Sequence, residues 1–280
     1  MTPFYLHFVG IGPQRTGTSW LNRLLQYHPA LCLPQGTIEP MFFDRYYTHG
    51  LSRYVSHFSR RRPDQRCGEI SPTYFDVEPV PERIYQLNPA CRIIINLRNP
   101  ISRALSLYRH HLSKGRVTGS FRQAAAHMPR IIDTGRYAQH ISRWLDVFGP
   151  AQVTFVLLDD VKCKPESVLS HIYRFLDINP IDLPQAAFDK INGLVMPRFP
   201  GLARLAARWV TNLQGAGFYQ FIELGKRLGL KQVVYAESTQ AAPRLTPDDQ
   251  NWLLATYETD IGFVENLLKR DLTTWRQIEG

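Results

Sequence analysis

The sequence predicts an α/β protein with a central parallel sheet flanked by helices. An apolar run at 5–11 is followed by a Gly/Pro-punctuated loop at 12–17, and then by a segment at 18–27 with apolar residues at helical spacing. Two further apolar runs, 91–97 and 153–160, each precede a segment with helical spacing. Strands that alternate with helices along a chain pair in parallel and are buried on both faces.

The first loop has the spacing of a phosphate-binding loop. The pattern Gly12-x4-Gly17-Thr18-Ser19 places small residues where backbone N–H groups converge on an anion at a helix N-terminus. Nucleotide triphosphatases carry lysine after the second glycine, whereas this chain carries Thr18, and the only cation in the loop is Arg15. We therefore expect an anion site that does not handle ATP in the usual way. The alternative is a glycine turn that binds no ligand.

The composition indicates a folded protein with an anionic ligand or surface. The 280 residues suit one large domain, with 192–243 as a lid or an acceptor-side insertion. A net charge of +9 favours an anionic ligand, although solubility alone also explains it. The four cysteines form no CxxC pair, so we expect no zinc site and no disulfide framework, and Cys32, Cys67 and Cys91 read as small buried hydrophobes.

The cellular location is also an expectation of the sequence. No basic segment opens the chain, and no apolar run is long enough to span a bilayer. We therefore expect a cytoplasmic protein with no transmembrane segment, and no nucleic acid among its partners. The oligomeric state is open at this point.

Glu39 is a candidate general base. It follows a short apolar strand at 30–34, and Pro40 holds it extended in front of an aromatic patch. Apolar neighbours raise the pKa of a carboxylate and suit it to accept a proton near neutral pH. An ordinary loop glutamate is the alternative. The aromatic and basic segment at 45–66 is either an acceptor-binding surface or a solvated helix face, and a short strand and turn follow at 67–74.

A second anion contact is predicted where the strand at 91–97 ends. Arg98 follows this strand, and Pro100 suits the first turn of the next helix. Ser106 lies about 9 Å along that helix from Pro100, so a phosphate held by Arg98 and Ser106 would lie along the helix flank. Because parallel strands end at the same edge, we expect Arg98 and the glycine loop to lie together. His110 is on the same helix, either facing the site or on the surface.

The remaining segments complete the α/β pattern. We expect a helix at 119–132 and another from 134, whose apolar stripe is most simply core packing. The strand at 153–160 ends in two aspartates, as in the metal-binding strand of a kinase, and a helix follows at 165–176. A closing helix begins at Thr246 as N-cap with Pro247 behind it.

Five segments in this order resemble the family of sulfotransferases that use 3′-phosphoadenosine-5′-phosphosulfate (PAPS), in the bacterial type related to heparan-sulfate sulfotransferase domains. The resemblance covers most of the chain and implies a P-loop-like, three-layer α/β fold. The segments are 13–19 (PQRTGTS), 39–43 (EPMFF), 68–74 (GEISPTY), 97–106 (LRNPISRALS) and 269–275 (KRDLTTW).

The resemblance also implies roles for individual residues. By analogy the first segment holds the 5′-phosphosulfate, Arg98 and Ser106 hold the 3′-phosphate, and Arg198 stands in for a basic loop that the chain lacks. The implied catalytic residues are Glu39 as base, Arg15 and His110. The implied cofactor-binding residues are Gln14, Arg15, Thr16, Gly17, Thr18, Ser19, Trp20, Arg98, Ser106 and Arg198.

Two departures affect the implied mechanism. Arg15 stands where the family usually has lysine, so stabilisation of the leaving group is electrostatic instead of acid catalysis. Ile38 replaces a second lysine. The expected reaction moves the sulfuryl group from PAPS to a hydroxyl or amine without metal and leaves adenosine 3′,5′-bisphosphate (PAP). The acceptor is a small molecule, a lipid or a glycan. The rivals are a kinase that uses ATP and magnesium, and a non-catalytic nucleotide-binding module.

Overall fold

The computed structural model describes residues 4–188 and 243–277 of the chain. The chain divides into two compact units, each built from two stretches of sequence. The first unit comprises 1–99 and 136–191, and the second comprises 100–135 and 192–280. The expectation of a single domain stays a prediction, and the lid expected at 192–243 lies almost entirely outside the described residues.

A five-stranded sheet organises the first unit, in the order β2-β3-β1-β4-β5. Every neighbouring pair of strands is parallel, which confirms the predicted fold class. After β1 the chain forms β2 and β3 on one side of β1, and it then forms β4 and β5 on the other side. The direction of strand addition therefore reverses between β1 and β4. Ligands in open α/β sheets bind at such a point. The strands are β1 (Phe8–Ile11), β2 (Leu31–Cys32), β3 (Arg66–Ile70), β4 (Arg92–Leu97) and β5 (Val153–Leu157).

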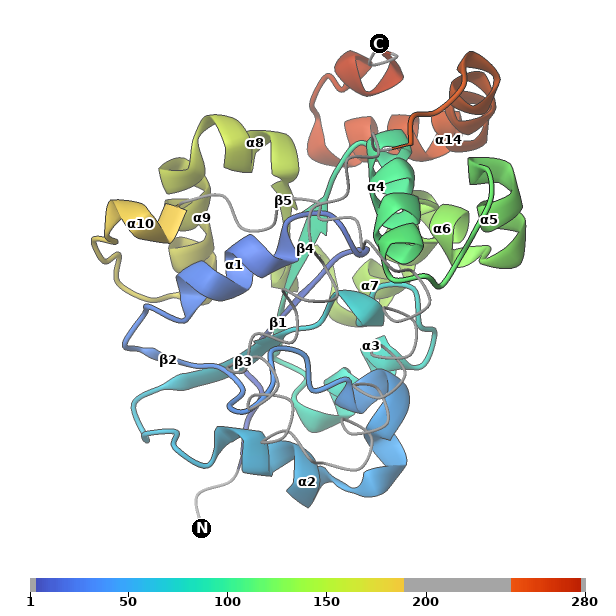
Figure 1. Ribbon diagram of the computed structural model, residues 1–280. Helices are drawn as coiled ribbons and strands as arrows, with labels where there is room; N and C mark the ends of the chain where they lie inside the picture. The colour runs from blue at the N-terminus through green and yellow to red at the C-terminus, as the bar shows by residue number, and fades with distance from the viewer. Residues whose placement is uncertain (1–3, 189–242, 278–280) are drawn as a thin grey trace. The chain divides into compact units, whose positions relative to one another are not determined.

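Helices cover both faces of this sheet (Figure 1). On one face, strand residues such as Phe8 and Ile94 share a hydrophobic core with Leu21 and Leu24 of α1 and with Ile172 of α9. That layer consists of α1 (Thr18–Leu25), α8 (Leu158–Cys163), α9 (Pro165–Leu176) and α10 (Gln185–Phe188). The opposite face carries α3 (Val80–Leu87) and α7 (Tyr137–Phe148), which pack against each other.

Short helices make up most of the rest of the first unit. They fill the predicted aromatic and basic segment and the turns that follow β3 and α7. They are η1 (Phe42–Tyr46), η2 (Tyr47–His49), α2 (Leu51–Val55), η3 (Ser56–Phe58), η4 (Pro72–Tyr74) and η5 (Pro150–Gln152).

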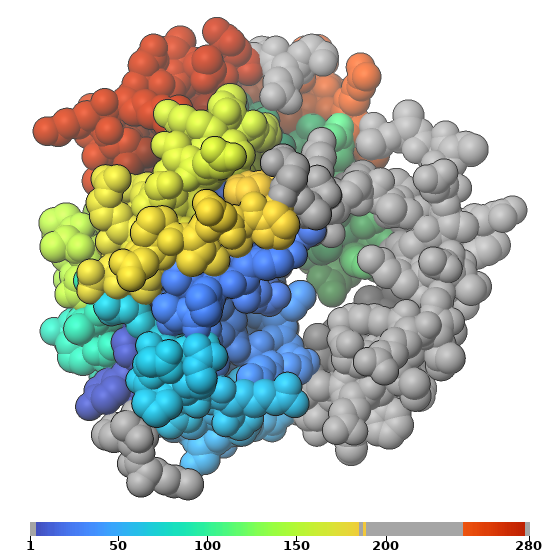
Figure 2. All heavy atoms as spheres, turned by 90° about the vertical axis from the view of Figure 1, so that its left-hand side faces the viewer, coloured from blue at the N-terminus to red at the C-terminus, as the bar shows by residue number. Residues whose placement is uncertain are grey.

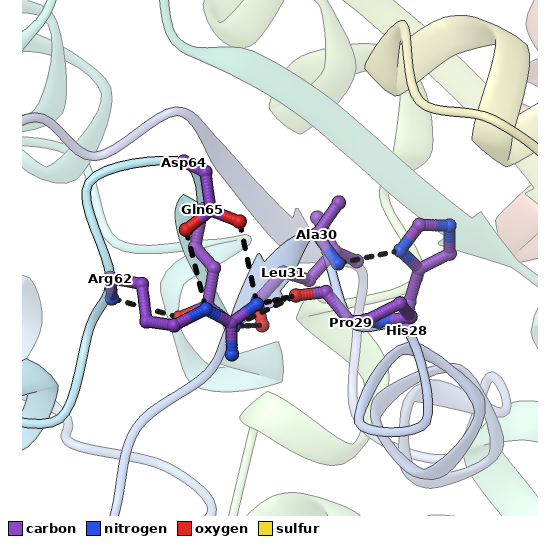
Figure 3. A network of polar contacts seen from close by, with 7 residues as sticks. All are labelled: His28, Pro29, Ala30, Leu31, Arg62, Asp64 and Gln65. Atoms are coloured by element: carbon purple, nitrogen blue, oxygen red, sulfur yellow. Dashed lines mark hydrogen bonds and ion pairs between the residues drawn. The ribbon is translucent and has the colours of Figure 1, made fainter.

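The short strand β2 is held by side chains of the turn that precedes β3 (Figure 3). Arg62 Nη2 and Gln65 Nε2 both donate to the Pro29 carbonyl, at 2.8 and 2.9 Å, and Gln65 also donates to the Leu31 carbonyl at 3.0 Å. Arg62 forms an ion pair with Asp64 at 3.3 Å. Arg62, in the aromatic and basic segment at 45–66, therefore has a structural role, because it fixes the strand that leads to Glu39.

The second unit is helical in the part that the structure describes. In it, α4 packs against α5, α6 and α14. Arg103 of α4 is fully buried and donates to the Thr134 hydroxyl and to the Ile131 carbonyl, both at 2.6 Å. The predicted start of the last helix is confirmed, since Thr246 and Asp249 form a capping box. The elements are α4 (Pro100–Ser113), α5 (Phe121–His127), α6 (Arg130–Asp133), α14 (Pro247–Leu268) and η6 (Thr273–Arg276).

Two boundaries differ from the sequence-based expectation. The helix expected at 119–132 is divided into α5 and α6, because Pro129 disfavours helical geometry at Met128, whose φ is −132°. The strand expected at 153–160 ends at Leu157, and Asp159 and Asp160 lie in the first turn of α8. The three cysteines expected to be buried are buried, and all four thiols are free.

Candidate functional site

The loop between β1 and α1 presents backbone N–H groups at the carboxyl end of β1. Gly12 has a φ of 134°, and a Cβ at this position would lie 2.3 Å from the carbonyl oxygen of Asn96, so the loop requires glycine there. Gly17, with a φ of 93°, is the N-cap of α1, where no side chain caps the helix and no acid lies in the first turn. The first N–H groups of a helix have no partner inside it, and its dipole adds positive potential. The loop is therefore suited to a phosphate or a sulfate.

Arg15 brings a partly desolvated cation to this loop. Its side chain is half-buried, and burial lowers the pKa of its guanidinium. Its φ of 79° lies in the left-handed region, which costs a non-glycine residue about 1–2 kcal/mol. Thr16 is fully buried, and its hydroxyl donates to the Pro13 carbonyl at 2.8 Å. The Thr16 side chain thus fixes the loop itself, while Arg15 supplies its charge.

The other loop residues that sequence assigned to a cofactor lie at different depths. Gln14 is half-buried, Thr18 is buried and Ser19 is exposed. Trp20 is buried. Its indole packs in the hydrophobic core with α9, and the backbone N–H of Trp20 donates to the Gly17 carbonyl at 3.0 Å. The Trp20 side chain therefore packs α1 against the core, and a role for Trp20 in binding the cofactor stays a prediction.

Arg98 reaches the same loop from the next strand. β1 and β4 are neighbours, with Ile11 opposite Ile95, so the residues after both strands emerge at one edge. Arg98 Nη1 donates to the carbonyl oxygen of Arg15 at 3.3 Å. The Tyr137 hydroxyl donates to the carbonyl of Arg98 at 2.6 Å. The Arg98 guanidinium and the loop that leads into α1 therefore lie together where the strand order reverses, as the sequence predicts.

Glu39 lies in the connection from β2 to η1 and is half-buried. Burial and, to a smaller extent, the nearby negative charge of Asp44 raise the pKa of its carboxyl, while Arg45 lowers it, and the resulting pKa is about 7. The raised pKa agrees with the expectation of a carboxylate among apolar neighbours. At neutral pH such a group is partly ionised and can accept a proton.

The remaining predicted residues lie elsewhere. Ser106 and His110 are both half-buried on α4, in the second unit. The His110 ring lies 5.5 Å from the His111 ring, and the His110 carbonyl accepts a hydrogen bond from the Ser113 hydroxyl at 2.9 Å. Arg198 lies outside the described residues. Roles for these three side chains stay predictions.

The aspartates that suggested a kinase have other partners. Asp159 is 3.8 Å from Lys162 Nζ, and Asp160 is 3.8 Å from Lys164 Nζ, both within or next to α8. They begin a helix, where acids favour the dipole, instead of ending a strand beside a bound nucleotide. Over the described ranges, no three His, Cys, Asp or Glu side chains gather into a metal-binding group.

Glu69 lies in the segment 68–74, and the sequence predicts no role for it. The structure buries its carboxyl completely, with its pKa raised to about 8 by burial. A glutamate within the buried strand at 66–70 is the feature of the sequence that could have indicated this buried acid. The sequence also predicts no role for Asp44, whose negative charge raises the pKa of both Glu39 and Glu69.

Comparison with known proteins identifies the family. Residues 7–192, more than half of the chain, match the family model described as a sulfotransferase domain. The chain belongs to the PAPS-dependent sulfotransferase family. Two curated sulfotransferases illustrate the relationship. Heparan sulfate glucosamine 3-O-sulfotransferase 6 of Homo sapiens is 34% identical over 179 residues, which cover 61% of this chain and 52% of that protein. The bifunctional heparan sulfate N-deacetylase/N-sulfotransferase of Drosophila melanogaster is 32% identical over 206 residues, which cover 62% of this chain and 20% of that protein.

This sulfotransferase chain therefore spans about half the length of one relative and a fifth of the other. Among solved structures, a sulfotransferase from Alicyclobacillus acidocaldarius has the same fold, with a TM-score of 0.69 and 24% identity over 98% of this chain and 100% of that one. Within the described ranges, no helix is long and apolar enough to cross a membrane.

Proposed function

We propose that this sulfotransferase moves the sulfuryl group of PAPS to a hydroxyl or amine of an acceptor. One observation carries the proposal: Arg98 donates to the backbone carbonyl of Arg15, so its guanidinium lies at the loop that carries Arg15 and leads into α1. A ligand with a single phosphate would need only one of these two arginines. PAPS carries a 5′-phosphosulfate and a 3′-phosphate, and it therefore suits a paired site. Family membership supports this donor.

The proposed donor site divides the two anions between the two strands. Arg15 and the N–H groups at 17–19 bind the 5′-phosphosulfate, with Gln14 beside them. Arg98 binds the 3′-phosphate, and the family resemblance alone adds Ser106 to this role. Arginine suits both places because its planar group donates two parallel hydrogen bonds to an anion.

The proposed reaction is an in-line displacement at sulfur. The acceptor oxygen or nitrogen forms a bond to sulfur as the bond to the bridging oxygen breaks, and negative charge grows on that oxygen. Arg15 and the loop N–H groups stabilise this charge, and one such donor typically contributes about 3 kcal/mol. Glu39 removes the acceptor's proton, a role worth about 10²–10⁴ in rate. His110 is the second candidate for proton transfer.

The reaction as proposed needs no metal ion. A kinase reading is disfavoured because Thr18 replaces the phosphate-binding lysine, and because Asp159 and Asp160 lie in helix α8 next to lysines. For the acceptor, a glycan stands first among the three classes, since the curated relatives are named for heparan sulfate.

Calorimetric titration of the purified chain tests the donor. PAP and ATP are compared, each with EDTA and with magnesium. We expect PAP to bind at least 100-fold more tightly than ATP, with the same affinity in EDTA. Magnesium-dependent ATP binding with no preference for a 3′-phosphate would overturn the proposal in favour of a kinase. Transfer of labelled sulfuryl from PAPS to desulfated heparan then separates an enzyme from a binding module.

A further inference from the structure

A buried acid in the sheet has no part in the reaction proposed above. Glu69 of β3 lies opposite Val9 of β1, and its side chain is completely buried. Its Oε2 accepts a hydrogen bond from the Ser71 hydroxyl at 3.4 Å, while Oε1 has no hydrogen-bond partner among the described residues. Burying a carboxyl group costs folding free energy, and an apolar residue of similar volume avoids that cost. Glu69 is therefore a candidate for a functional role.

Two buried tyrosines face the Glu69 carboxyl. The hydroxyls of Tyr54 and Tyr74 lie close enough to it to lower its pKa, against the larger effect of burial. Both tyrosines are buried, and burial raises the pKa of each phenol, so both stay protonated at neutral pH. Two other titratable groups interact with Glu69, the carboxylate of Asp44 and the thiol of Cys91.

Tyr74 links this acid to the segment that carries Glu39. Its hydroxyl oxygen accepts a hydrogen bond from the backbone N–H of Phe43 at 3.2 Å. Its ring also packs edge-on against the Phe43 ring, with centroids 5.8 Å apart and planes at 88°. From the other side, Arg83 Nη1 donates to the Phe43 carbonyl at 2.5 Å. Phe43 is thus fixed at both its N–H and its carbonyl, four residues after Glu39.

The same segment contains strained backbone that needs such support. Met41, the residue before η1, has a φ of 52°, in the left-handed region. Strained residues persist where the surrounding structure over-determines them. The ring of Phe42 stacks on Tyr54, with centroids 4.7 Å apart and planes at 17°, which adds a second attachment beside the Phe43 N–H.

We propose that Glu69 is a positioning residue: it orients the Tyr74 hydroxyl toward the Phe43 N–H and thereby fixes the segment 39–44. The Tyr74 proton is directed to the carboxyl, which leaves an oxygen lone pair for the amide of Phe43. The inference rests on the proposed function, because its consequence is the placement of Glu39 against the acceptor. Misplacement of a catalytic group by about 1 Å can cost on the order of 100-fold in rate.

The first test removes the Tyr74 hydroxyl and leaves its ring. In Tyr74→Phe we expect the amide of Phe43 to exchange with solvent deuterium at least tenfold faster, measured by NMR. Tyr54→Phe is the matched control, because its hydroxyl is buried beside the same acid but makes no hydrogen bond in the described structure. It should leave that exchange rate within twofold. Equal exchange rates in the two variants, or no change in Tyr74→Phe, would overturn the proposal.

The second test asks whether the acid itself sets this geometry. Glu69→Gln keeps an acceptor oxygen and should preserve slow exchange at Phe43, whereas Glu69→Leu should behave like Tyr74→Phe. If Glu69→Leu does not fold, the exchange rates of Glu69→Gln and Tyr74→Phe still test the proposal. Slow exchange in Glu69→Leu, or fast exchange in Glu69→Gln, would overturn the proposal.

Catalysis supplies a readout that a purely structural role would not move. With PAPS as donor and desulfated heparan as the acceptor probe, Tyr74→Phe should lower kcat about tenfold while the Kd for PAP stays within twofold. Loss of PAP affinity equal to the loss of kcat would overturn the inference. If the wild-type chain neither binds PAP nor transfers sulfuryl, the proposed function fails. The exchange experiment then shows separately whether Glu69 fixes the segment.

Discussion

The guanidinium of Arg98 donates a hydrogen bond to the backbone carbonyl of Arg15 at 3.3 Å. This contact joins the residue after β4 to the loop after β1, where the strand order reverses. Arg98 therefore both shapes the loop and adds positive charge to it. The consequences can be measured in binding, catalysis and stability.

Loss of Arg98 should affect the 3′-phosphate selectively. We expect Arg98→Ala to weaken PAP by about 10- to 100-fold, since a hydrogen bond to a charged group contributes about 1.5–3 kcal/mol. AMP, which lacks the 3′-phosphate, should lose far less affinity. Calorimetry with both nucleotides measures the difference. Arg60→Ala, at an exposed position, controls for the lost charge. Unchanged discrimination between PAP and AMP would contradict the assignment.

Gly12 should tolerate no side chain. We expect Gly12→Ala to lower the free energy of unfolding by about 3 kcal/mol, because its Cβ would meet the Asn96 backbone at 2.3 Å and the left-handed φ adds strain. Gly36→Ala is the control, because Gly36 also has a positive φ of 75° but has open space around it. Urea denaturation measures both variants. Equal losses of unfolding free energy in the two variants would show that backbone strain, and not the clash with Asn96, causes the effect.

Activity should decline below about pH 7 if Glu39 is the base. The ionised carboxylate accepts the proton, and burial with the charge of Asp44 raises its pKa to about 7. kcat/KM should therefore fall tenfold per pH unit on the acidic side. Asp44→Asn removes the like charge, so the acidic limb should move to lower pH. Asp182→Asn, at an exposed position, should not move it.

Glu39→Gln should abolish most turnover, by about 10²–10⁴, and leave PAP affinity nearly intact. Transfer of labelled sulfuryl and calorimetry on the same preparation check the two quantities. Equal loss of turnover and of affinity would remove Glu39 from the role of base.

The fold should lose stability as the pH rises toward 8. Glu69 has a pKa raised to about 8 in the folded chain, against 4.5 for an ordinary glutamate. The folded state therefore binds more protons between these values, and its stability falls by up to about 1.4 kcal/mol per pH unit. In Glu69→Gln this dependence should be reduced. Urea denaturation at pH 5, 6, 7 and 8 measures it, and parallel profiles for both chains would contradict the assignment.

Much of the fold follows from local sequence. The apolar β-branched run that forms β4 and the helical stripe of α9 were predicted because buried parallel strands and amphipathic helices have simple patterns. The glycine loop was predicted because its spacing directly reflects backbone geometry. The predicted end of β5 was wrong, because the apolar pattern continues past Leu157 and does not mark where the strand ends and the helix begins at Leu158.

The sequence by itself determined the parallel α/β class, the glycine loop after the first strand and the residues on two neighbouring strand ends, because each depends on contacts within a short stretch. Only the tertiary structure decided that Arg98 touches Arg15, that Trp20 belongs to the core, and that Glu69 lies behind the Glu39 segment. These depend on which strands are neighbours and on how far each side chain is removed from water. Both are properties of the assembled sheet and its packing, which no local pattern encodes.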